Sequence, residues 1–434
     1  MVMSWNFHRY YSDRTDGLIS KLKLAEPRVA KLKGLRDLVR NRTKDVFNEA
    51  KEIVKTSDAT ISLESITARV ANTRLKYLSA QAQAEAAKLL KDMDDEAREA
   101  FLTLTPRFWT QGSFQYDTLN YPYATPPQEM DIDDGTYLPM AIFEDRPVIG
   151  HQLLILLVDS SLKSLVHDNV GWEFEAKRTC ARIKIPAEHT HIDVPMYAIP
   201  KDQFLLKEAA LAKSRSTVFD SINGSLSLED ADAGYELDEN CVNLALREGE
   251  QKWMKSDPKI VEDWFNECCR RIGPHLRSIC RFMKSWRDVQ WEKGGGPSSI
   301  SLMAATVNIL DRIAHDKDDL GATMRMIAKY LPDEFSKGVE SPDHTDEKPL
   351  FPPRLEHGER ELEIMSKLSE LHGILIDAQQ CSSKELALDS INRAFGKRVL
   401  KSDLIVSEKS APAFSNEPTR GVQATTISTT MASG

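Results

Sequence analysis

The sequence Gln111-Gly112-Ser113-Phe114-Gln115-Tyr116 leads, through a loop that contains three prolines, to Asp131-Ile132-Asp133. A small Gly-Ser turn can bind a phosphate group with its backbone N–H groups. In a β-strand, residues two apart lie on the same face, so Asp131 and Asp133 project together while Ile132 faces the core. Two carboxylates beside a phosphate-binding turn suit metal-dependent nucleotidyl transfer. The pattern therefore predicts a metal site on a strand, next to a phosphate loop.

A third acid follows in an alternating stretch. His191-Ile192-Asp193-Val194 is typical of a strand whose two aliphatic residues pack inward while Asp193 faces outward. Such an acid can help to hold a metal ion and take the proton from an attacking hydroxyl group. Like charges this close repel one another, and two bound Mg²⁺ ions, or Mn²⁺ in their place, would remove the conflict. The competing interpretation is that the three acids are solvated strand residues. Asp134 should face the other way and is excluded from the site.

Basic and hydroxyl side chains elsewhere are candidates for contacts with nucleotide. Arg182 lies on an expected strand, where it meets either phosphate or solvent. Lys284 shares one side of an expected helix with Arg281 and Arg287, which makes either a triphosphate clamp or an ordinary charged helix surface. Ser298-Ser299 follows a proline, and the simplest interpretation is that these serines cap the start of a helix. The alternative is a contact with phosphate, which helix N-termini also bind.

Composition limits the classes of protein that remain. The chain has 434 residues, of which 41% are hydrophobic and 28% charged, as in globular proteins with two or three domains. A net charge of −9 argues against a stable complex with nucleic acid. The longest apolar run, 153–158, is too short to span a bilayer, and residues 1–11 lack a secretory signal. Six scattered cysteines suggest free thiols. We therefore expect a cytoplasmic protein with no membrane partner.

The pattern along the chain predicts four parts. Residues 1–110 are expected to form helices that brace a core, and residues 111–235 a nucleotidyltransferase core with the strands described above. An acidic linker at 231–239 leads to a helical lobe at 236–408. Residues 409–434 are rich in Ser, Thr and Ala, which is typical of a disordered tail. The fold class is thus α+β, with a mixed sheet and helices packed against a helical lobe.

Several longer blocks resemble the cGAS/DncV-like nucleotidyltransferases of bacterial antiphage signalling. They include the stretches at 111–116, 128–135 and 191–195, and the more distinctive blocks at 104–110, 256–264 and 345–353. The resemblance covers nearly the whole chain. It implies a polymerase-β-like core packed against a helical lobe, with the active site in the cleft between them. It also implies a synthase that joins ATP and GTP in two steps into 3′,3′-cyclic GMP-AMP, releases two pyrophosphates and serves as a second-messenger enzyme in antiphage (CBASS) defence.

The same resemblance assigns roles to particular residues. It implies catalytic and metal-binding roles for Asp131, Asp133 and Asp193. The positions that it implies for nucleotide contact are Gln111, Gly112, Ser113, Phe114, Gln115, Tyr116, Arg182, Ser256, Lys284, Ser299 and Asp346. For the tail it implies conjugation through Gly434 by ubiquitin-like E1/E2 enzymes, because an extended terminus can enter another enzyme's site. The cyclic dinucleotide would then reach a downstream effector.

Two other functions stay open from the residues. One is a transferase that makes linear oligonucleotides, or adds single nucleotides, on the same core. The other is a non-catalytic scaffold conjugated through its C-terminus, against which the intact set of three acids argues. A cyclic product that resists phosphatase would separate the synthase from both.

Overall fold

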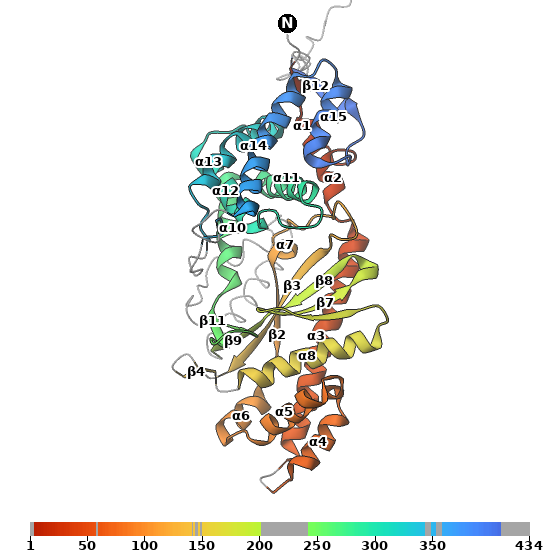
Figure 1. Ribbon diagram of the computed structural model, residues 1–434, viewed down its shortest axis with the longest axis vertical. Coiled ribbons are helices and arrows are strands. Elements are labelled where there is room, and N and C mark those ends of the chain that lie inside the picture. The colour runs from red at the N-terminus through yellow and green to blue at the C-terminus, as the bar shows by residue number, and fades with distance from the viewer. Residues whose placement is uncertain are drawn as a thin grey trace, which may run out of the picture.

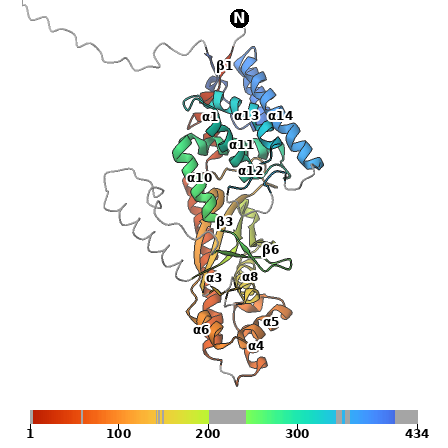
Figure 2. The ribbon, with the colours of Figure 1, turned by 90° about the vertical axis from the view of Figure 1, so that its left-hand side faces the viewer.

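The computed structural model describes residues 4–57, 60–140, 142–143, 146–147, 150–200, 242–342, 349–352 and 358–408. Asp346, Gly434, the predicted linker at 231–239 and the predicted tail at 409–434 lie outside them. The C-terminal helices lie at one end of the molecule, the sheet in the middle and three N-terminal helices at the other end (Figure 1). The perpendicular view has the same order (Figure 2). No helix in the described residues has the length and apolar composition to cross a membrane.

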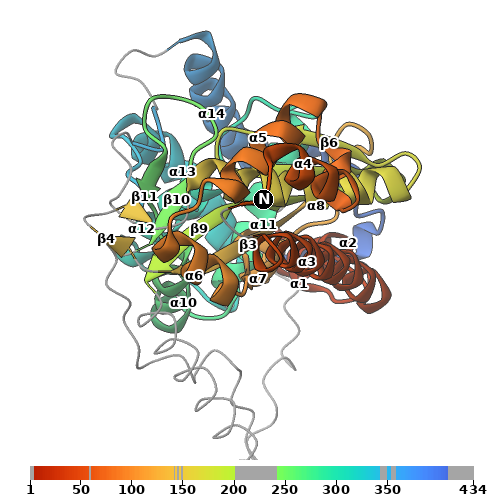
Figure 3. The ribbon, with the colours of Figure 1, turned by 90° about the horizontal axis from the view of Figure 1, so that it is seen from below.

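The N-terminal segment is helical, as the sequence predicts, but in several pieces. The long helix α3 (Glu26–Lys55) runs beside the sheet to the end formed by α4, α5 and α6, from which Figure 3 is seen. Side-chain caps explain three of the helix starts, because Ser62, Ser79 and Asp94 each accept a hydrogen bond from the backbone three residues on. The other helices of this part are α1 (His8–Ser12), α2 (Leu18–Leu22), α4 (Leu63–Ala71), α5 (Ala80–Lys91) and α6 (Asp95–Thr103).

The central sheet is mixed, with β3 in its middle. The order is β11-β10-β9-β3-β8-β7-β6, and β2 also pairs with β3. Its strands are β2 (Arg107–Gln111), β3 (Met130–Met140), β6 (Glu173–Ala176), β7 (Ala181–Ile185), β8 (Thr190–Val194), β9 (Met196–Pro200), β10 (Asn243–Ala245) and β11 (Trp253–Lys255). A short pair joins β4 (Ile142–Phe143) to β5 (Arg146–Pro147), and another joins β1 (Trp5–Asn6) to β12 (Val406–Ser407).

Strands β8 and β9 run parallel to β3 in a single register. Met130 pairs with Thr190 at one end and Met140 with Pro200 at the other. Pro195 has no N–H group and therefore interrupts the strand that the sequence predicts over 189–199, but its carbonyl still accepts a hydrogen bond from Thr136 at 2.8 Å. The register is thus unbroken along eleven residues of β3.

The described residues pack around two large hydrophobic cores. Helix α8 (His151–Asp168) buries the aliphatic face that its spacing predicts and packs with α3 against the sheet. The C-terminal helices form the second core, in which α1 and α2 are also buried. These helices are α10 (Pro258–Ile272), α11 (His275–Gln290), α12 (Ser299–Arg312), α13 (Leu320–Ser336), α14 (Glu359–Gln380) and α15 (Lys384–Phe395). The first residues of the chain therefore stabilise the C-terminal lobe.

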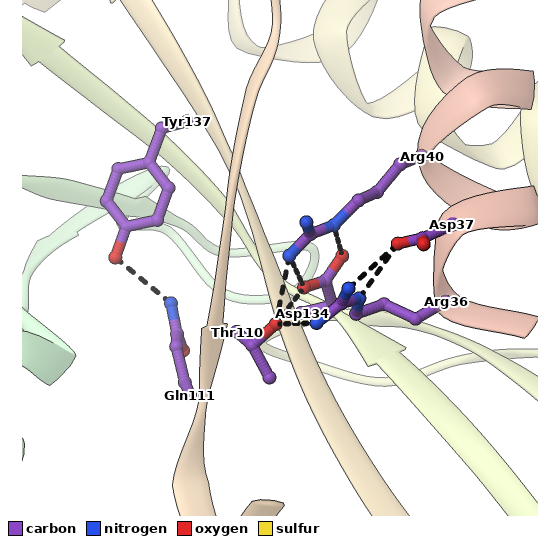
Figure 4. A network of polar contacts seen from close by, with 7 residues as sticks. All are labelled: Arg36, Asp37, Arg40, Thr110, Gln111, Asp134 and Tyr137. Atoms are coloured by element: carbon purple, nitrogen blue, oxygen red, sulfur yellow. Dashed lines mark hydrogen bonds and ion pairs between the residues drawn. The ribbon is translucent and has the colours of Figure 1, made fainter. Parts of the chain in front are cut away.

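A buried ion pair ties α3 to the strand that carries the acids (Figure 4). Arg40 donates hydrogen bonds to Asp134 at 2.7 Å and to the hydroxyl of Thr110 at 2.9 Å. Thr110 in turn donates to Asp134 at 3.0 Å, and the side chain of Asp134 is only 1% exposed. Asp134 thus faces away from Asp133, as the alternation predicts, and anchors β3 from behind.

Replacing Arg40 by methionine keeps an unbranched apolar stem but leaves Asp134 buried without its cation. We expect the free energy of unfolding to fall by about 3 kcal/mol, the usual cost of breaking a buried pair. Urea denaturation followed by circular dichroism measures the change. The control variant Asp37→Asn removes a half-exposed acid that contacts Arg36 and should change the free energy by less than about 0.5 kcal/mol. An Arg40→Met protein as stable as the wild type would contradict the anchoring role.

Candidate active site

The sheet register brings the three predicted acids together on one face. Asp131 pairs with His191 and Asp133 pairs with Asp193, and directly paired residues in neighbouring strands point to the same side. Possible ligand atoms of Asp131, His191 and Asp193 all lie within 4.8 Å of one another. Ile132 and Ile192 are fully buried beneath this face. The register therefore places the three acids on one face, and the cluster within 4.8 Å consists of Asp131, Asp193 and His191.

Gly112 lets the turn approach the acids closely. It has a φ of +64°, and a Cβ atom there would lie 2.1 Å from the Oδ2 atom of Asp133. Only glycine adopts this backbone conformation without strain and also leaves that space. The one-turn helix α7 (Gly112–Gln115) then carries Ser113 to the edge of the acids, where Ser113 borders both cavities described below.

The other residues of the predicted phosphate turn make contacts within the protein. Gln111 donates to the hydroxyl of Tyr137 at 3.0 Å, as Figure 4 shows, and accepts from Tyr197 at 3.2 Å. Phe114 packs against the core of the sheet, and Gln115 donates to Glu262 at 3.0 Å. Tyr116 is buried and borders the cavity that Gly112 and Asp133 also border. Direct contact of Gln111, Phe114 and Gln115 with nucleotide stays a prediction.

Two internal cations face the acids. Arg182 donates to both oxygens of Asp193, at 2.6 and 2.7 Å. The Nε2 atom of His191 lies 2.9 Å from Oδ1 of Asp131. Burial lowers the pKa of His191, but its contact with Asp131 and that residue's charge outweigh burial and raise the pKa. Arg182 therefore offsets the charge of Asp193, and His191 lies against Asp131.

Within the described residues, no cation contacts Asp133 in this way. Its withdrawal from water, together with the charges of Asp131 and Asp193, raises the pKa of Asp133 to about 8. A bound cation would relieve this conflict, and three carboxylates on one face supply the oxygen ligands that Mg²⁺ and Mn²⁺ prefer. The residues present therefore fit a divalent metal site.

Two adjoining cavities of similar size lie beside the acids. The cavity at Glu129 has a volume of about 380 Å³ and is bordered by Glu129, Asp131, His191, Arg287 and the glycines at 294–296, among others. The cavity at Gly112 has a volume of about 400 Å³ and is bordered by Gly112, Asp131, Asp133, Tyr116 and Met303, among others. Ser113, Asp131, Lys284 and Ser299 border both. Asp131 is therefore the acid that the two cavities share.

Helix α11 supplies a buried lysine to both cavities. Lys284 is 5% exposed and donates to the backbone carbonyl of Thr118 at 2.8 Å. Burial, and then the charge of Arg287, lowers the pKa of Lys284 to about 8. Arg281 is also buried and donates to Asp117 at 2.6 Å, so the interpretation as helix surface charge is wrong for both. Contact of Lys284 with a triphosphate stays a prediction, and its position at both cavities is compatible with it.

The two serines before α12 have different positions. Ser298 is the N-cap, and its hydroxyl accepts from the backbone N–H of Ser301 at 3.1 Å. Ser299 borders both cavities and accepts from Arg287 at 2.6 Å. Ser256 follows β11, borders neither cavity, and stays a predicted contact.

The sequence prediction omits Glu129 and His191. Glu129 Oε2 lies 2.8 Å from Nδ1 of His191, on the side of the ring opposite Asp131. The alternation of the strand does place His191 on the same face as Asp193. The sequence does not show that the strand of His191 pairs with the strand of Asp131. Only this pairing reveals that the two residues are neighbours.

The chain matches two family models. One, described as a cyclic GMP-AMP synthase DncV-like nucleotidyltransferase domain, covers residues 106–197, and one described as a cyclic GMP-AMP synthase C-terminal domain covers residues 273–408. The cyclic GMP-AMP synthase of Vibrio cholerae serotype O1 is 61% identical over 438 aligned residues, which cover 100% of both chains. This chain belongs to the DncV-like cyclic GMP-AMP synthase family. The predicted family is therefore confirmed.

Solved structures of the family support the fold. A mutant of the Vibrio cholerae di-nucleotide cyclase in complex with ATP, GTP and 5MTHFGLU2 has 61% identity and a TM-score of 0.85, and the match covers 93% of this chain and 99% of that one. The Vibrio cholerae synthase in complex with the linear intermediate 5′ pppA(3′,5′)pG has 60% identity, a TM-score of 0.84 and the same coverage. The predicted nucleotidyltransferase core with a helical C-terminal lobe is confirmed.

The Gly112→Ala variant should lose most of its activity. The added methyl group would push the carboxylate of Asp133 aside, and a displacement of about 1 Å commonly lowers kcat about a hundredfold. Pyrophosphate release from nucleoside triphosphates measures the loss. Gly34→Ala is the matched control, because nothing lies within 4 Å of the atom it adds. Unchanged turnover in Gly112→Ala would show that the turn does not need this close approach.

The metal-free protein should become less stable as pH rises, through Asp133. A carboxyl whose pKa is raised on folding stabilises the folded state while protonated, so this contribution is lost between about pH 4 and pH 8. Asp133→Asn removes the penalty. At pH 8 its Tm without metal should exceed that of the wild type, with a smaller gap near pH 4. The exposed-site variant Asp92→Asn is the control. Equal Tm values for Asp133→Asn and wild type across this range would refute the role of Asp133.

Proposed function

We propose that this chain joins ATP and GTP into cyclic GMP-AMP, in two successive nucleotidyl transfers that release two pyrophosphates. The observation that carries the proposal is the pair of cavities, of about 380 and 400 Å³, that share Ser113, Asp131, Lys284 and Ser299. Two nucleotides can therefore lie side by side, with Asp131 between them. The first transfer would give a linear dinucleotide, and the second would close the ring after the intermediate is rebound.

The cavity at Gly112 suits the nucleotide whose α-phosphate is attacked. It contains Gly112, Ser113 and Asp133, so a triphosphate there would lie between the turn and the acids. Ser113 would bind the phosphate with its hydroxyl and backbone, and Lys284 would balance its charge. The Mg²⁺ ions, when bound by Asp131, Asp133 and Asp193, would neutralise charge on the phosphates and the leaving pyrophosphate.

The cavity at Glu129 suits the nucleotide that supplies the attacking hydroxyl group. Asp193 would take the proton from that hydroxyl. Each oxygen of Asp193 accepts one hydrogen bond from Arg182 and keeps a further lone pair for this proton. Arg182, on the same face of the sheet, would also bind a phosphate group, as predicted. A relative of 60% identity has been solved with the linear intermediate 5′ pppA(3′,5′)pG, which supports a two-step path.

Several finer assignments belong to the same proposal. They are the 3′,3′ linkage, the presence of two Mg²⁺ ions, a role in CBASS defence through a downstream effector, and nucleotide contact by Ser256 and Asp346. The division at residues 110, 235 and 408 and the conjugation of Gly434 by E1/E2 enzymes are also proposed. Support for them comes from family membership and from the motifs in the sequence.

Incubation with ATP, GTP and MgCl₂ tests the proposed activity directly. We expect mass spectrometry to detect a phosphatase-resistant cyclic GMP-AMP and two pyrophosphates per product, and nuclease digestion to identify both linkages. Only linear dinucleotides, or AMP attached to protein, would contradict the proposal in favour of the alternative transferase. No nucleotide product at all would favour the scaffold.

The Asp131→Asn/Asp133→Asn variant should make no product, because the metal site is then left with one carboxylate, that of Asp193. We expect product to fall more than about a thousandfold, while circular dichroism shows an unchanged fold. The control Asp92→Asn/Asp95→Asn removes the same charge from an exposed site between α5 and α6 and should retain activity. Retained synthesis in the first variant would refute the metal-binding role.

A further inference from the structure

Two histidines of the C-terminal lobe face each other with their Nε2 atoms 3.0 Å apart. His275 is the first residue of α11, and His315 lies in the connection between α12 and α13. The ring centroids are 5.2 Å apart, and both residues are partly exposed to solvent. Neither histidine borders the two cavities beside the acids. A pair of imidazole nitrogens therefore lies outside the proposed active site and within reach of solvent.

The backbone on each side positions these two rings. Gly273, between α10 and α11, has a φ of +124°, and a Cβ atom there would lie 2.9 Å from Nδ1 of His275. Only glycine adopts this φ without strain and also leaves that space for the ring. The connection that carries His315 is held by Thr323, whose hydroxyl donates to the carbonyl of Asp316 at 2.6 Å. The two rings are therefore brought together by the fold before any ligand binds.

Both rings are in a form that can bind a metal ion. Nδ1 of His315 lies 3.3 Å from the carbonyl oxygen of Ile313, which can only accept, so we assign the proton to Nδ1 and the lone pair to Nε2. Burial, and then the neighbouring His315 and Lys317, lowers the pKa of His275 to about 4, although Asp318 acts in the other direction. The His275 ring is therefore neutral near pH 7, and neutral imidazole is the form that binds metal ions.

We propose that His275 and His315 form a binding site for a divalent transition-metal ion such as Zn²⁺, with both Nε2 atoms as ligands and water in the remaining positions. Two nitrogens that bind one Zn²⁺ at about 2.0–2.1 Å in tetrahedral geometry are about 3.3 Å apart, so a small rotation of the rings is enough. The ion would replace the proton between the rings, and His275 would carry that proton on Nδ1 instead. The carbonyl of Ile313 would hold His315 in the required tautomer, as outer partners of metal-bound histidines commonly do.

This site differs from the acids in the metal that it prefers. Imidazole suits Zn²⁺ and Cu²⁺, whereas carboxylates suit Mg²⁺ and Mn²⁺. The bound ion would join the start of α11 to the connection between α12 and α13, two segments that are 40 residues apart in the sequence. It would therefore stabilise the C-terminal lobe without taking part in nucleotidyl transfer.

The test is Zn²⁺ binding to the full-length protein, measured by isothermal titration calorimetry with excess MgCl₂ to occupy the acids. We expect one Zn²⁺ per chain and a rise in Tm, because a ligand of the folded state stabilises it. His275→Phe and His315→Phe each keep a ring but remove a ligand nitrogen, and each should weaken binding by about a hundredfold, since the second ligand no longer adds to the first. The control His372→Phe replaces another partly exposed histidine with a lowered pKa and should bind Zn²⁺ as the wild type does.

Copper spectroscopy identifies the ligands in the unchanged protein. Cu²⁺ bound to the wild type in excess MgCl₂ should give the electron spin-echo modulation of two imidazole rings. A wild type that binds no Zn²⁺, wild-type affinity in both His275→Phe and His315→Phe, or a copper signal from fewer than two rings would overturn the proposal. Synthesis with MgCl₂ alone should be unchanged in His275→Phe, because neither histidine borders the cavities. The binding results hold whether the product is cyclic or linear, so they do not depend on the proposed function.

Discussion

The parallel register of β3 with β8 is the constraint on which the rest of the site depends. It places Asp131 beside His191 and Asp133 beside Asp193, all on one face. A shift of one residue would turn either pair into the core, because side chains alternate along a strand. Ile132 and Ile192, fully buried on the other side, make such a shift costly. Arg40 adds to this by holding Asp134 from behind. The packing of the sheet therefore sets the geometry of the chemistry.

The second constraint is electrostatic. Three carboxylates on one face repel one another, and the protein places Arg182 against Asp193 and His191 against Asp131. Burial, together with the charges of Asp131 and Asp193, raises the pKa of Asp133 to about 8. The site therefore favours a divalent cation. Lys284 is buried and borders both cavities. In the proposed function, its positive charge balances the negative charge of the triphosphate.

The sequence predicted the parts of the site that follow from local pattern. Alternation placed Asp131 and Asp133 together and turned Asp134 away, and the motif before them located the close turn at Gly112. It did not assign roles to His191 and Glu129, because the pairing of distant strands is not a local property. It left open whether Arg281 and Lys284 are exposed, which depends on the loop at 117–120 packing against α11. Nor did it indicate that α1 and α2 pack into the C-terminal lobe, since that contact joins opposite ends of the chain.

The most direct test of this account is the anomalous scattering of Mn²⁺ in crystals grown with a nonhydrolysable ATP analogue. The account predicts metal peaks bound by Asp131, Asp133 and Asp193, with the triphosphate lying against Ser113 and the β3–β8 register unchanged. Peaks bound elsewhere, or a triphosphate bound away from the Gly112-Ser113 turn, would contradict it.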